Sequence, residues 1–298
     1  MTGARGITEA GLNKIATLSQ KAQRTEKQQA ELERLIAKRD AVVFSSTCLE
    51  HLMKCFIQVK YDRNYLLSNK YLTKGSQMEN DSITLYSRVK VKVYKKNTDR
   101  LSNDYIEGEP DLIEGGSILN ASRVIDTKTP WDIYSFFSTI TKALNEAYYY
   151  QLQGYSALTG ADDLTLAYCL VNAPASLIKS EKYKLYHSLA CPDDDDPEYR
   201  NGCIEIEKNM IVDMQQFRKD NPFFDLDCSD WSYDIPRKER VIEFAFKRDE
   251  QVIKQIYQRV VECRQWLNWF AQQQADQIRI VTNKAEIRKL LTIKEDFN

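Results

Sequence analysis

Asp111, Asp126 and Lys128 are the residues whose types and spacing are best suited to chemistry. The apolar residues just before Asp126 favour a β-strand, and side chains on a strand point alternately to opposite faces. Asp126 and Lys128 are therefore predicted to share one face, while Ile125 and Thr127 point to the other. We expect one face of this strand to carry the reactive side chains and the other to pack in the hydrophobic core.

A turn is predicted to bring Asp111 towards this strand. Gly115 and Gly116 stand between two apolar runs, and a two-residue type I′ turn needs a positive φ at both central residues. They predict a hairpin that folds the first run back alongside the second. Pro110 lacks an N–H and interrupts regular pairing, so the carboxylate of Asp111 is expected to reach across to Asp126.

Two carboxylates and an ammonium group in one small volume favour a metal site. Like charges held together raise each other's pKa unless a cation lies between them, and oxygen ligands with room for water and phosphate suit Mg²⁺ or Mn²⁺. The sequence thus points to a divalent metal site at Asp111 and Asp126. A salt-bridged hairpin with surface carboxylates is the alternative that these residues alone leave open.

A family resemblance starts from the same residues. Gly108-Glu109-Pro110-Asp111 followed by Asp126-Thr127-Lys128 resembles the signature of the PD-(D/E)XK nuclease superfamily. The surroundings resemble its viral recombination branch, the lambda-type, YqaJ-like alkaline exonucleases of phages. The second acid is Asp where many members have Glu, a variation that the signature allows.

Other segments resemble the same family in the same order, over roughly residues 70 to 180. The run from Lys74 to Glu79 resembles its upstream glycine-then-acid helix, which implies that Glu79 is an additional active-site carboxylate. Gln151 and Tyr155 are similar to the QxxxY element of RecB-like nucleases. The turn after Lys128, the apolar strand at 166–171 and a late segment at 235–241 also resemble parts of the family.

The resemblance implies an α/β fold with a restriction-endonuclease-like central mixed sheet flanked by helices. It implies a metal-dependent deoxyribonuclease that digests one strand of linear double-stranded DNA from 5′ to 3′ during recombination. An endonuclease or a catalytically inactive DNA-binding module on the same fold is the alternative. A hydrolase of another class, with Asp111 and Asp126 as general acid and base, leaves Lys128 without a role.

The resemblance also implies a role for each residue. Asp111 holds two Mg²⁺ or Mn²⁺ ions, Asp126 and the Thr127 carbonyl complete one site, and Glu79 completes the coordination. Lys128 orients or deprotonates the attacking water. A second group, Gln151 and Tyr155, positions that lysine or a phosphate. Double-stranded DNA ends, a ring-shaped homotrimer and a single-strand annealing protein are the implied partners.

Composition limits the class of protein. The 298 residues are 43% hydrophobic and 29% charged, as in an ordinary globular protein, and apolar runs long enough for a membrane are lacking. Without an apolar leader, and with seven irregularly spaced cysteines, the chain is expected in a reducing cytoplasm, that of the host if it is phage-encoded.

The net charge of −1 argues against a surface coated with basic residues, but it allows a local basic channel. Arg88, Lys90 and Lys92 alternate with valines, which predicts a strand with one basic face that contacts phosphates. A solvated outer strand face is the alternative.

Two domains are expected: an N-terminal helical extension at 1–40 and the exonuclease domain at 41–298. Segment 7–40 is predicted to be a helix with a weak apolar stripe at heptad-like spacing, formed by Ile15, Leu18, Ala22, Leu32 and Ile36. Ser45 precedes another amphipathic stretch and is predicted to cap its helix; in the family a serine near this position contacts the DNA end.

Further elements are predicted from periodicity and capping. Gly75 opens the helix of Glu79, residues 138–159 form one long helix, and residues 164–171 and 241–246 form strands. Asp249 is expected to cap a long C-terminal helix. The four acids at 193–196 are expected to form a solvated loop, with a metal site as the alternative.

Overall fold

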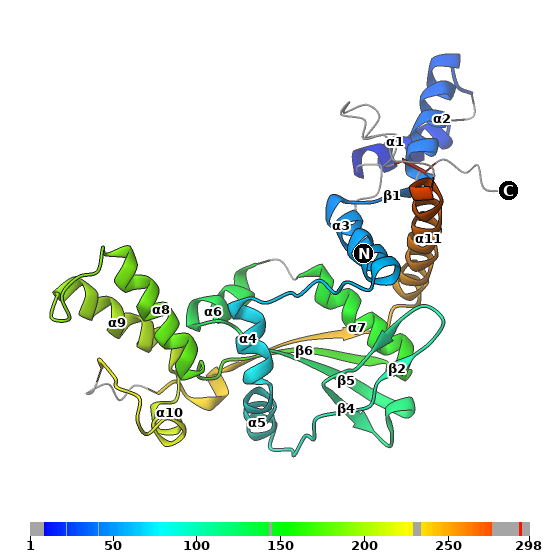
Figure 1. Cartoon of the computed structure of the whole chain (residues 1–298). Coiled ribbons are helices and arrows are strands. Elements are labelled where there is room, and N and C mark those ends of the chain that lie inside the picture. The colour runs from blue at the N-terminus through cyan, green and yellow to red at the C-terminus, as the bar shows by residue number, and fades with distance from the viewer. Residues whose placement is uncertain are drawn as a thin grey trace. The chain divides into compact units, whose positions relative to one another are not determined.

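A mixed four-stranded sheet forms the centre of the computed structural model, which describes residues 9–21, 23–40, 42–142, 145–228, 234–275 and 292–293 (Figure 1). Its strands, in spatial order, are β4 (Leu112–Gly115), β5 (Ala121–Lys128), β6 (Asp163–Cys169) and β7 (Val241–Lys247). The central pair β5 and β6 is parallel, and both outer pairs are antiparallel. Because a parallel pair needs a crossover, the chain passes through two helices between β5 and β6.

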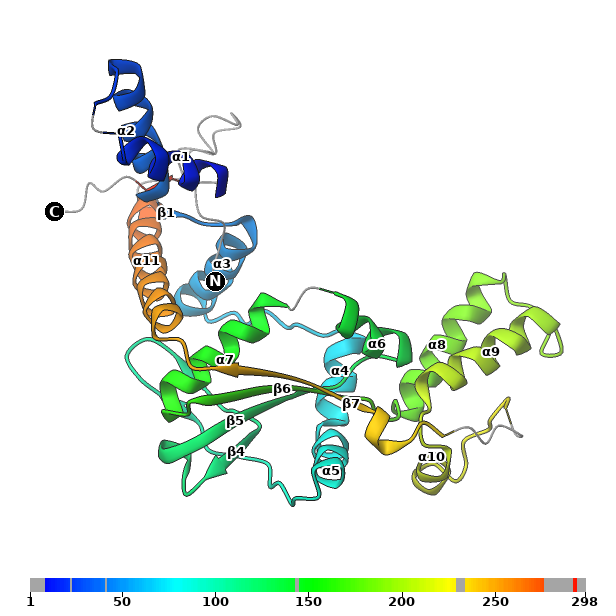
Figure 2. The same ribbon diagram turned by 180° about the vertical axis from the view of Figure 1, so that it is seen from behind.

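Helices cover both faces of this sheet (Figures 1 and 2). On one face α5 (Glu79–Lys90) packs Ile83 and Tyr86 against Ile125 of β5. On the other face α7 (Glu146–Thr159) packs Leu152 against Val124 of β5. The predicted fold class, a mixed sheet flanked by helices, is confirmed. As predicted, Asp126 and Lys128 lie on one face of β5 and Ile125 packs in the core on the other, but the face of Asp126 also contributes Val124 to a hydrophobic core.

The segment before the sheet differs from the prediction in two places. Gly75 lies inside a separate helix, α4 (Lys70–Gln77), and Glu79 begins α5 after a single intervening residue, Met78. The basic strand is a helix: Arg88 and Lys90 belong to the last turn of α5, and Lys92 follows its end. Alternating valines favour a strand, but the helical spacing of the buried side chains in α5 prevails over that local preference.

The predicted hairpin is present with a longer loop. Beyond the pair formed by Glu114 and Arg123 the register shifts, so that Gly115 pairs with Ala121. The loop contains a 3₁₀ turn, η1 (Ile118–Asn120). Of the two glycines, only Gly115 has a positive φ, of 124°, and a Cβ there would lie 2.8 Å from the Asn120 carbonyl oxygen. The two-residue type I′ turn is therefore wrong, although the pairing that it predicted is correct.

The long helix predicted at 138–159 is two helices. They are α6 (Ile133–Thr141), which a capping box of Asp132 and Ser135 begins, and α7, which Asn145 caps. Residues 143 and 144 lie outside the described part. Each helix has its own capping residue, which the apolar pattern did not distinguish from helix interior.

Beyond β6 the chain forms further helices, the last two of them within segment 190–234. The helices are α8 (Ala175–Ser188), α9 (Pro197–Met210) and α10 (Met214–Asp220), and they share one core cluster. Asp196, the last of the four acids, caps α9. Among the described residues, no three His, Cys, Asp or Glu side chains lie together at a spacing that holds a metal ion.

Two short strands and a 3₁₀ turn lie outside the four-stranded sheet. Strands β2 (Leu101–Ser102) and β3 (Glu107–Gly108) form a small antiparallel pair, and η2 (Arg237–Glu239) leads into β7. Strand β7 itself matches the prediction. Asp249 accepts hydrogen bonds from the backbone amides of Gln251 and Val252, as predicted for the cap of α11 (Glu250–Ala275).

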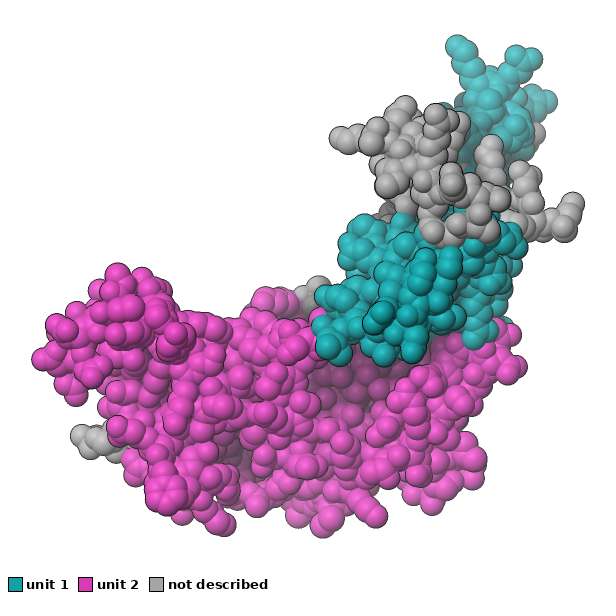
Figure 3. Space-filling view, viewed as in Figure 1, with its two compact units in different colours: residues 1–66, 254–298 teal, residues 67–253 magenta. Residues whose placement is uncertain are grey.

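Contacts divide the chain into two compact units, residues 67–253 and residues 1–66 with 254–298 (Figure 3). The sheet belongs to the first. The second contains α1 (Glu9–Ser19), α2 (Glu26–Asp40), β1 (Val42–Val43), α3 (Ser46–Tyr61), most of α11 and β8 (Thr292–Ile293). The domain boundary predicted at residue 40 stays a prediction.

The N-terminal segment contains two helices where one was predicted. Helices α1 and α2 pack Ile15 and Leu18 against Leu32 and Leu35, and residues 1–8 and Ala22 lie outside the described part. Ser45 caps α3 as predicted, accepting a hydrogen bond from the Cys48 amide at 3.2 Å. None of the helices in the described residues is both long and apolar enough to cross a bilayer.

Candidate active site

Asp111 lies directly before β4, where a buried asparagine holds the backbone. The Asn97 amide nitrogen donates to the Asp111 carbonyl at 2.8 Å, and its side chain donates to the Pro110 carbonyl at 3.0 Å. The carboxylate Oδ2 of Asp111 accepts hydrogen bonds from both the backbone N–H and the hydroxyl of Thr127, at 2.7 and 2.8 Å. Asp111 therefore reaches the residue next to Asp126. Asn97 has no motif around it and was missed from the sequence.

Asp126 and Lys128 point from β5 towards α7, where a chain of polar contacts begins. The Lys128 ammonium lies 2.6 Å from Oδ2 of Asp126 and donates to Oε1 of Gln151 at 3.3 Å. The Gln151 amide in turn donates to the Tyr155 hydroxyl at 2.8 Å. The structure thus brings together the four residues that were predicted on β5 and α7, and the ring of Tyr148 lies 4.8 Å beneath the ammonium.

Burial dominates the electrostatics of this cluster. It raises the pKa of Asp126 from 3.8 to about 6, against the attraction of Lys128, and the negative charges of Asp111 and Glu79 add to the rise. Burial also raises the pKa of Asp111, and the two hydrogen bonds from Thr127 offset this only in part. For both carboxyl groups the effect of burial on the pKa thus outweighs that of the nearby cation and hydrogen-bond donors.

Glu79 lies at the start of α5 and lines the same cleft as Asp111 and Lys128. Its carboxylate is paired with the Lys96 ammonium at 2.7 Å. The negative charge of Glu79 raises the pKa of both Asp111 and Asp126. Lys96 was not singled out from the sequence, because a lysine in a loop carries no pattern.

The donor set fits a divalent cation. Oδ2 of Asp126 is buried and lacks a hydrogen bond of good geometry within the described part, since the Lys128 contact is ionic. Three carboxylates, those of Glu79, Asp111 and Asp126, face two ammonium groups. Because no trio of side-chain ligands is preformed among the described residues, an ion between the two aspartates needs main-chain oxygen or water as further ligands.

A cleft of about 950 Å³ opens beside these groups. One wall carries Glu79, Asp111 and Lys128. The rings of Tyr71 and Trp131 and side chains of α6 also line the cleft. The cleft therefore presents acids, apolar rings and hydroxyls to one volume.

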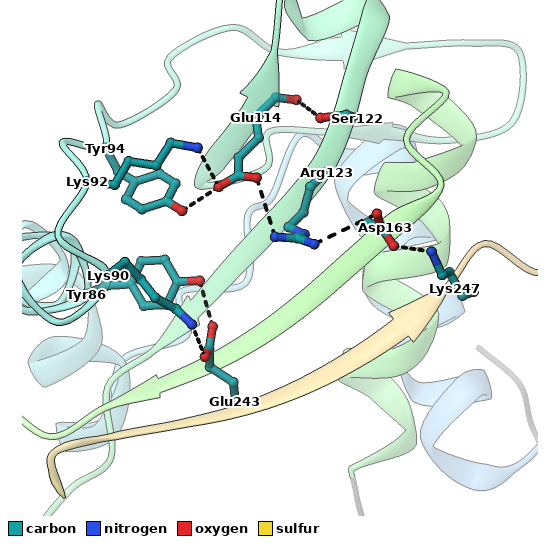
Figure 4. A network of polar contacts seen from close by, with 10 residues as sticks. All are labelled: Tyr86, Lys90, Lys92, Tyr94, Glu114, Ser122, Arg123, Asp163, Glu243 and Lys247. Carbon is teal, nitrogen blue, oxygen red and sulfur yellow. Dashed lines mark hydrogen bonds and ion pairs between the residues drawn. The ribbon is translucent and has the colours of Figure 1, made fainter. Parts of the chain in front are cut away.

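The residues predicted to bind DNA are not gathered there. Lys90 pairs with Glu243, and Lys92 lies 2.7 Å from Glu114, both on the α5 side of the sheet (Figure 4). Arg88 lines a separate cavity of about 630 Å³. The predicted basic face is thus absent: its lysines form ion pairs with acids of the sheet, and Ser45 belongs to the other unit.

Comparisons with solved structures support the fold. A phage-related exonuclease from Haemophilus somnus 129PT superposes with a TM-score of 0.55 at 22% identity, over 87% of this chain and 95% of that one. An alkaline exonuclease from Laribacter hongkongensis, LHK-Exo, covers 78% of this chain and 87% of its own at 12% identity, with a TM-score of 0.47. No family model and no curated protein matches the chain. At 22% identity, the likeness to the phage-related exonuclease shows the fold alone.

Proposed function

We propose that this protein is a metal-dependent DNA exonuclease. The observation that carries the proposal is the buried carboxylate of Asp126 near the partly buried Asp111, with the Lys128 ammonium 2.6 Å from Asp126. A structural ion pair would balance these charges, whereas here three carboxylates, those of Glu79, Asp111 and Asp126, face only the ammonium groups of Lys96 and Lys128. That arrangement suits a site whose remaining partner is a divalent cation.

The chain's own residues divide the work. Asp111, Asp126 and the Thr127 carbonyl would hold Mg²⁺ or Mn²⁺, with Glu79 contributing directly or through water. Two such ions would neutralise the phosphate and lower the pKa of a bound water. Lys128 orients the attacking water or accepts its proton.

Further side chains hold Lys128 and Asp111 in position. Gln151, anchored on Tyr155, holds the Lys128 side chain. Thr127 fixes the Asp111 carboxylate through two hydrogen bonds, which leaves its other oxygen to face the cleft.

Exonuclease action on DNA ends is the finer part of the proposal. It rests on the resemblance of the sequence motifs and on a fold shared with a phage-related exonuclease. On the same basis we propose 5′-to-3′ digestion of linear duplex in recombination, a ring-shaped homotrimer, a single-strand annealing partner and a cytoplasmic location.

The decisive experiment is a digestion time course on end-labelled linear duplex and on covalently closed circles, with Mg²⁺, Mn²⁺, Ca²⁺ or excess chelator. We expect nucleotides released from linear duplex with Mg²⁺ or Mn²⁺, none in chelator, and no turnover with Ca²⁺. Asp111→Asn should remove the activity, while Asp163→Asn, the same change in an aspartate that does not line the cleft, should retain it.

Each alternative predicts a different result. Cleavage of closed circles at a rate similar to that of linear duplex would identify an endonuclease. Binding of DNA without release of nucleotides under any metal would identify an inactive module. Full activity in excess chelator would remove metal-dependent hydrolysis from the proposal.

A further inference from the structure

Tyr71 and Trp131 form an aromatic pair in the cleft that holds the catalytic carboxylates. Tyr71 belongs to α4, and Trp131 lies in the turn between β5 and α6. Their ring centroids are 5.4 Å apart at an interplanar angle of 73°. Both line the cleft with Asp111 and Lys128, and Tyr71 is 59% exposed. A large aromatic side chain this exposed in a cleft is available to a ligand.

The position of this pair is specified by a buried lysine. Lys74, one helical turn after Tyr71, is fully buried, and its ammonium donates to the carbonyl oxygens of Trp131 at 2.8 Å and Val171 at 3.2 Å. Burial lowers its pKa to about 7, partly opposed by Asp132. Burying a lysine is costly, so the contact that ties α4 to the Trp131 turn is a specific constraint.

The ring of Trp131 is fixed as well. The Lys70 ammonium lies 4.5 Å from its centroid, and the same ammonium is paired with Glu181 at 3.0 Å. Backbone and ring of Trp131 are therefore both held, and Tyr71 packs against a rigid neighbour. A platform held in this way loses little conformational freedom when a flat ligand stacks on it.

We propose that Tyr71 and Trp131 are a stacking platform for an unpaired nucleobase next to the phosphate that is cleaved. The proposal rests on the proposed nuclease function and adds the ligand of the apolar wall. A nucleotide has a charged phosphate and a flat aromatic base, and the lining of this cleft includes both acids suited to cations and aromatic rings. Stacking on aromatic side chains is the usual sequence-tolerant way to hold single-stranded nucleic acid. The platform therefore acts on single-stranded ends of any sequence.

The test measures binding, so it does not depend on cleavage. Fluorescence anisotropy in chelator compares a labelled oligothymidylate with a strand of equal length and charge that carries abasic sites. Wild type should bind the oligothymidylate roughly 5- to 100-fold more tightly than the abasic strand. Tyr71→Ala should weaken binding of the oligothymidylate to the level of the abasic strand and leave the abasic strand unchanged, whereas Tyr71→Phe should retain the preference.

Tyr134→Ala is the matched control, because Tyr134 is 70% exposed on α6 and does not line the cleft. It should keep the preference for bases. Equal binding of the two strands by wild type, or an equal loss of base preference in Tyr134→Ala and Tyr71→Ala, would overturn the platform. Digestion of linear duplex by wild type separates the two proposals: cleavage without base preference removes only the platform, and base preference without cleavage removes only the nuclease.

Discussion

The two faces of the central sheet carry charged residues in opposite electrostatic states. Towards α7, Asp126 is buried, and its pKa is raised to about 6. Towards α5, a row of side chains crosses all four strands in register, from Glu114 to Arg123, Asp163 and Lys247 (Figure 4). There the Lys247 ammonium lowers the pKa of Asp163, with help from Arg123.

Glu114 shows that burial alone does not decide the difference. Burial raises the pKa of this carboxyl group, but hydrogen bonds from Lys92 and Tyr94 outweigh it, and the net change is downward. Each carboxylate in the outer row lies between cations, whereas acids outnumber cations around Asp126. The outer face is therefore balanced, and the inner face is left with charge that an added cation would neutralise.

The largest difference between the faces should appear in catalysis. Lys128→Ala is expected to lower cleavage by roughly 10²-fold or more, because it removes the ammonium group that we propose orients the attacking water or accepts its proton. Lys92→Ala deletes the same side chain from the outer face and should leave the rate within about twofold. Initial rates on end-labelled linear duplex, with circular dichroism to confirm folding, measure both. Near wild-type turnover by Lys128→Ala would show that this lysine is not catalytic.

The β5 side of the site followed from the sequence because strand periodicity is local. Alternation alone places Asp126 and Lys128 on one face, and the four-residue step from Gln151 to Tyr155 places both on one side of a helix. The sheet strands were recognisable for the same reason. The helix caps at Ser45 and Asp249 were also readable, because a cap depends on a few neighbouring residues.

What the sequence did not reveal depends on tertiary contacts. Lys90 and Lys92 looked like phosphate ligands until the structure showed acids of distant strands beside them. Asn97, Lys96 and Lys74 have no periodic signal, since their partners are carbonyls or carboxylates that only the fold brings near. The break between α6 and α7 was hidden because both helices are apolar on their packed sides.

A second difference between the faces should appear in stability. The folded-state pKa of Asp126, about 6, lies above its ordinary value of 3.8, so its ionised form disfavours folding. That cost is absent below about pH 4 and complete above about pH 6. Asp126→Asn should therefore gain stability over wild type through this window and keep the gain above it, by about 1 to 3 kcal/mol, a figure that already includes the attraction of Lys128 because that attraction is part of the raised pKa.

Urea unfolding in chelator, at several pH values from 4.5 to 7.5, measures this gain. Glu114→Gln is the control from the outer face, and its sign is opposite: the lowered pKa of Glu114 means that its ionised form stabilises the fold, so the variant should lose stability above about pH 4. If Asp126→Asn were no more stable than wild type at pH 7.5, the inner face would not carry unbalanced charge.

The smallest effect is expected from Arg123, which links two acids of the outer row. Its guanidinium lies 3.4 Å from Glu114 and 3.8 Å from Asp163, and its side chain is 42% exposed. Exposed pairs of this length gain little in water and are screened by salt, so Arg123→Ala should lower the thermal midpoint by less than about 2 °C in dilute buffer.

The difference in thermal midpoint between Arg123→Ala and wild type should shrink in 1 M NaCl. The difference for Asp126→Asn should persist, because the carboxylate that it replaces is buried. Paired thermal melts of the two variants at low and high salt make the comparison. A large loss of thermal stability in Arg123→Ala that salt does not change would mean that the outer row stabilises the fold as strongly as a buried polar network does. The two faces would then differ less than their electrostatics indicate.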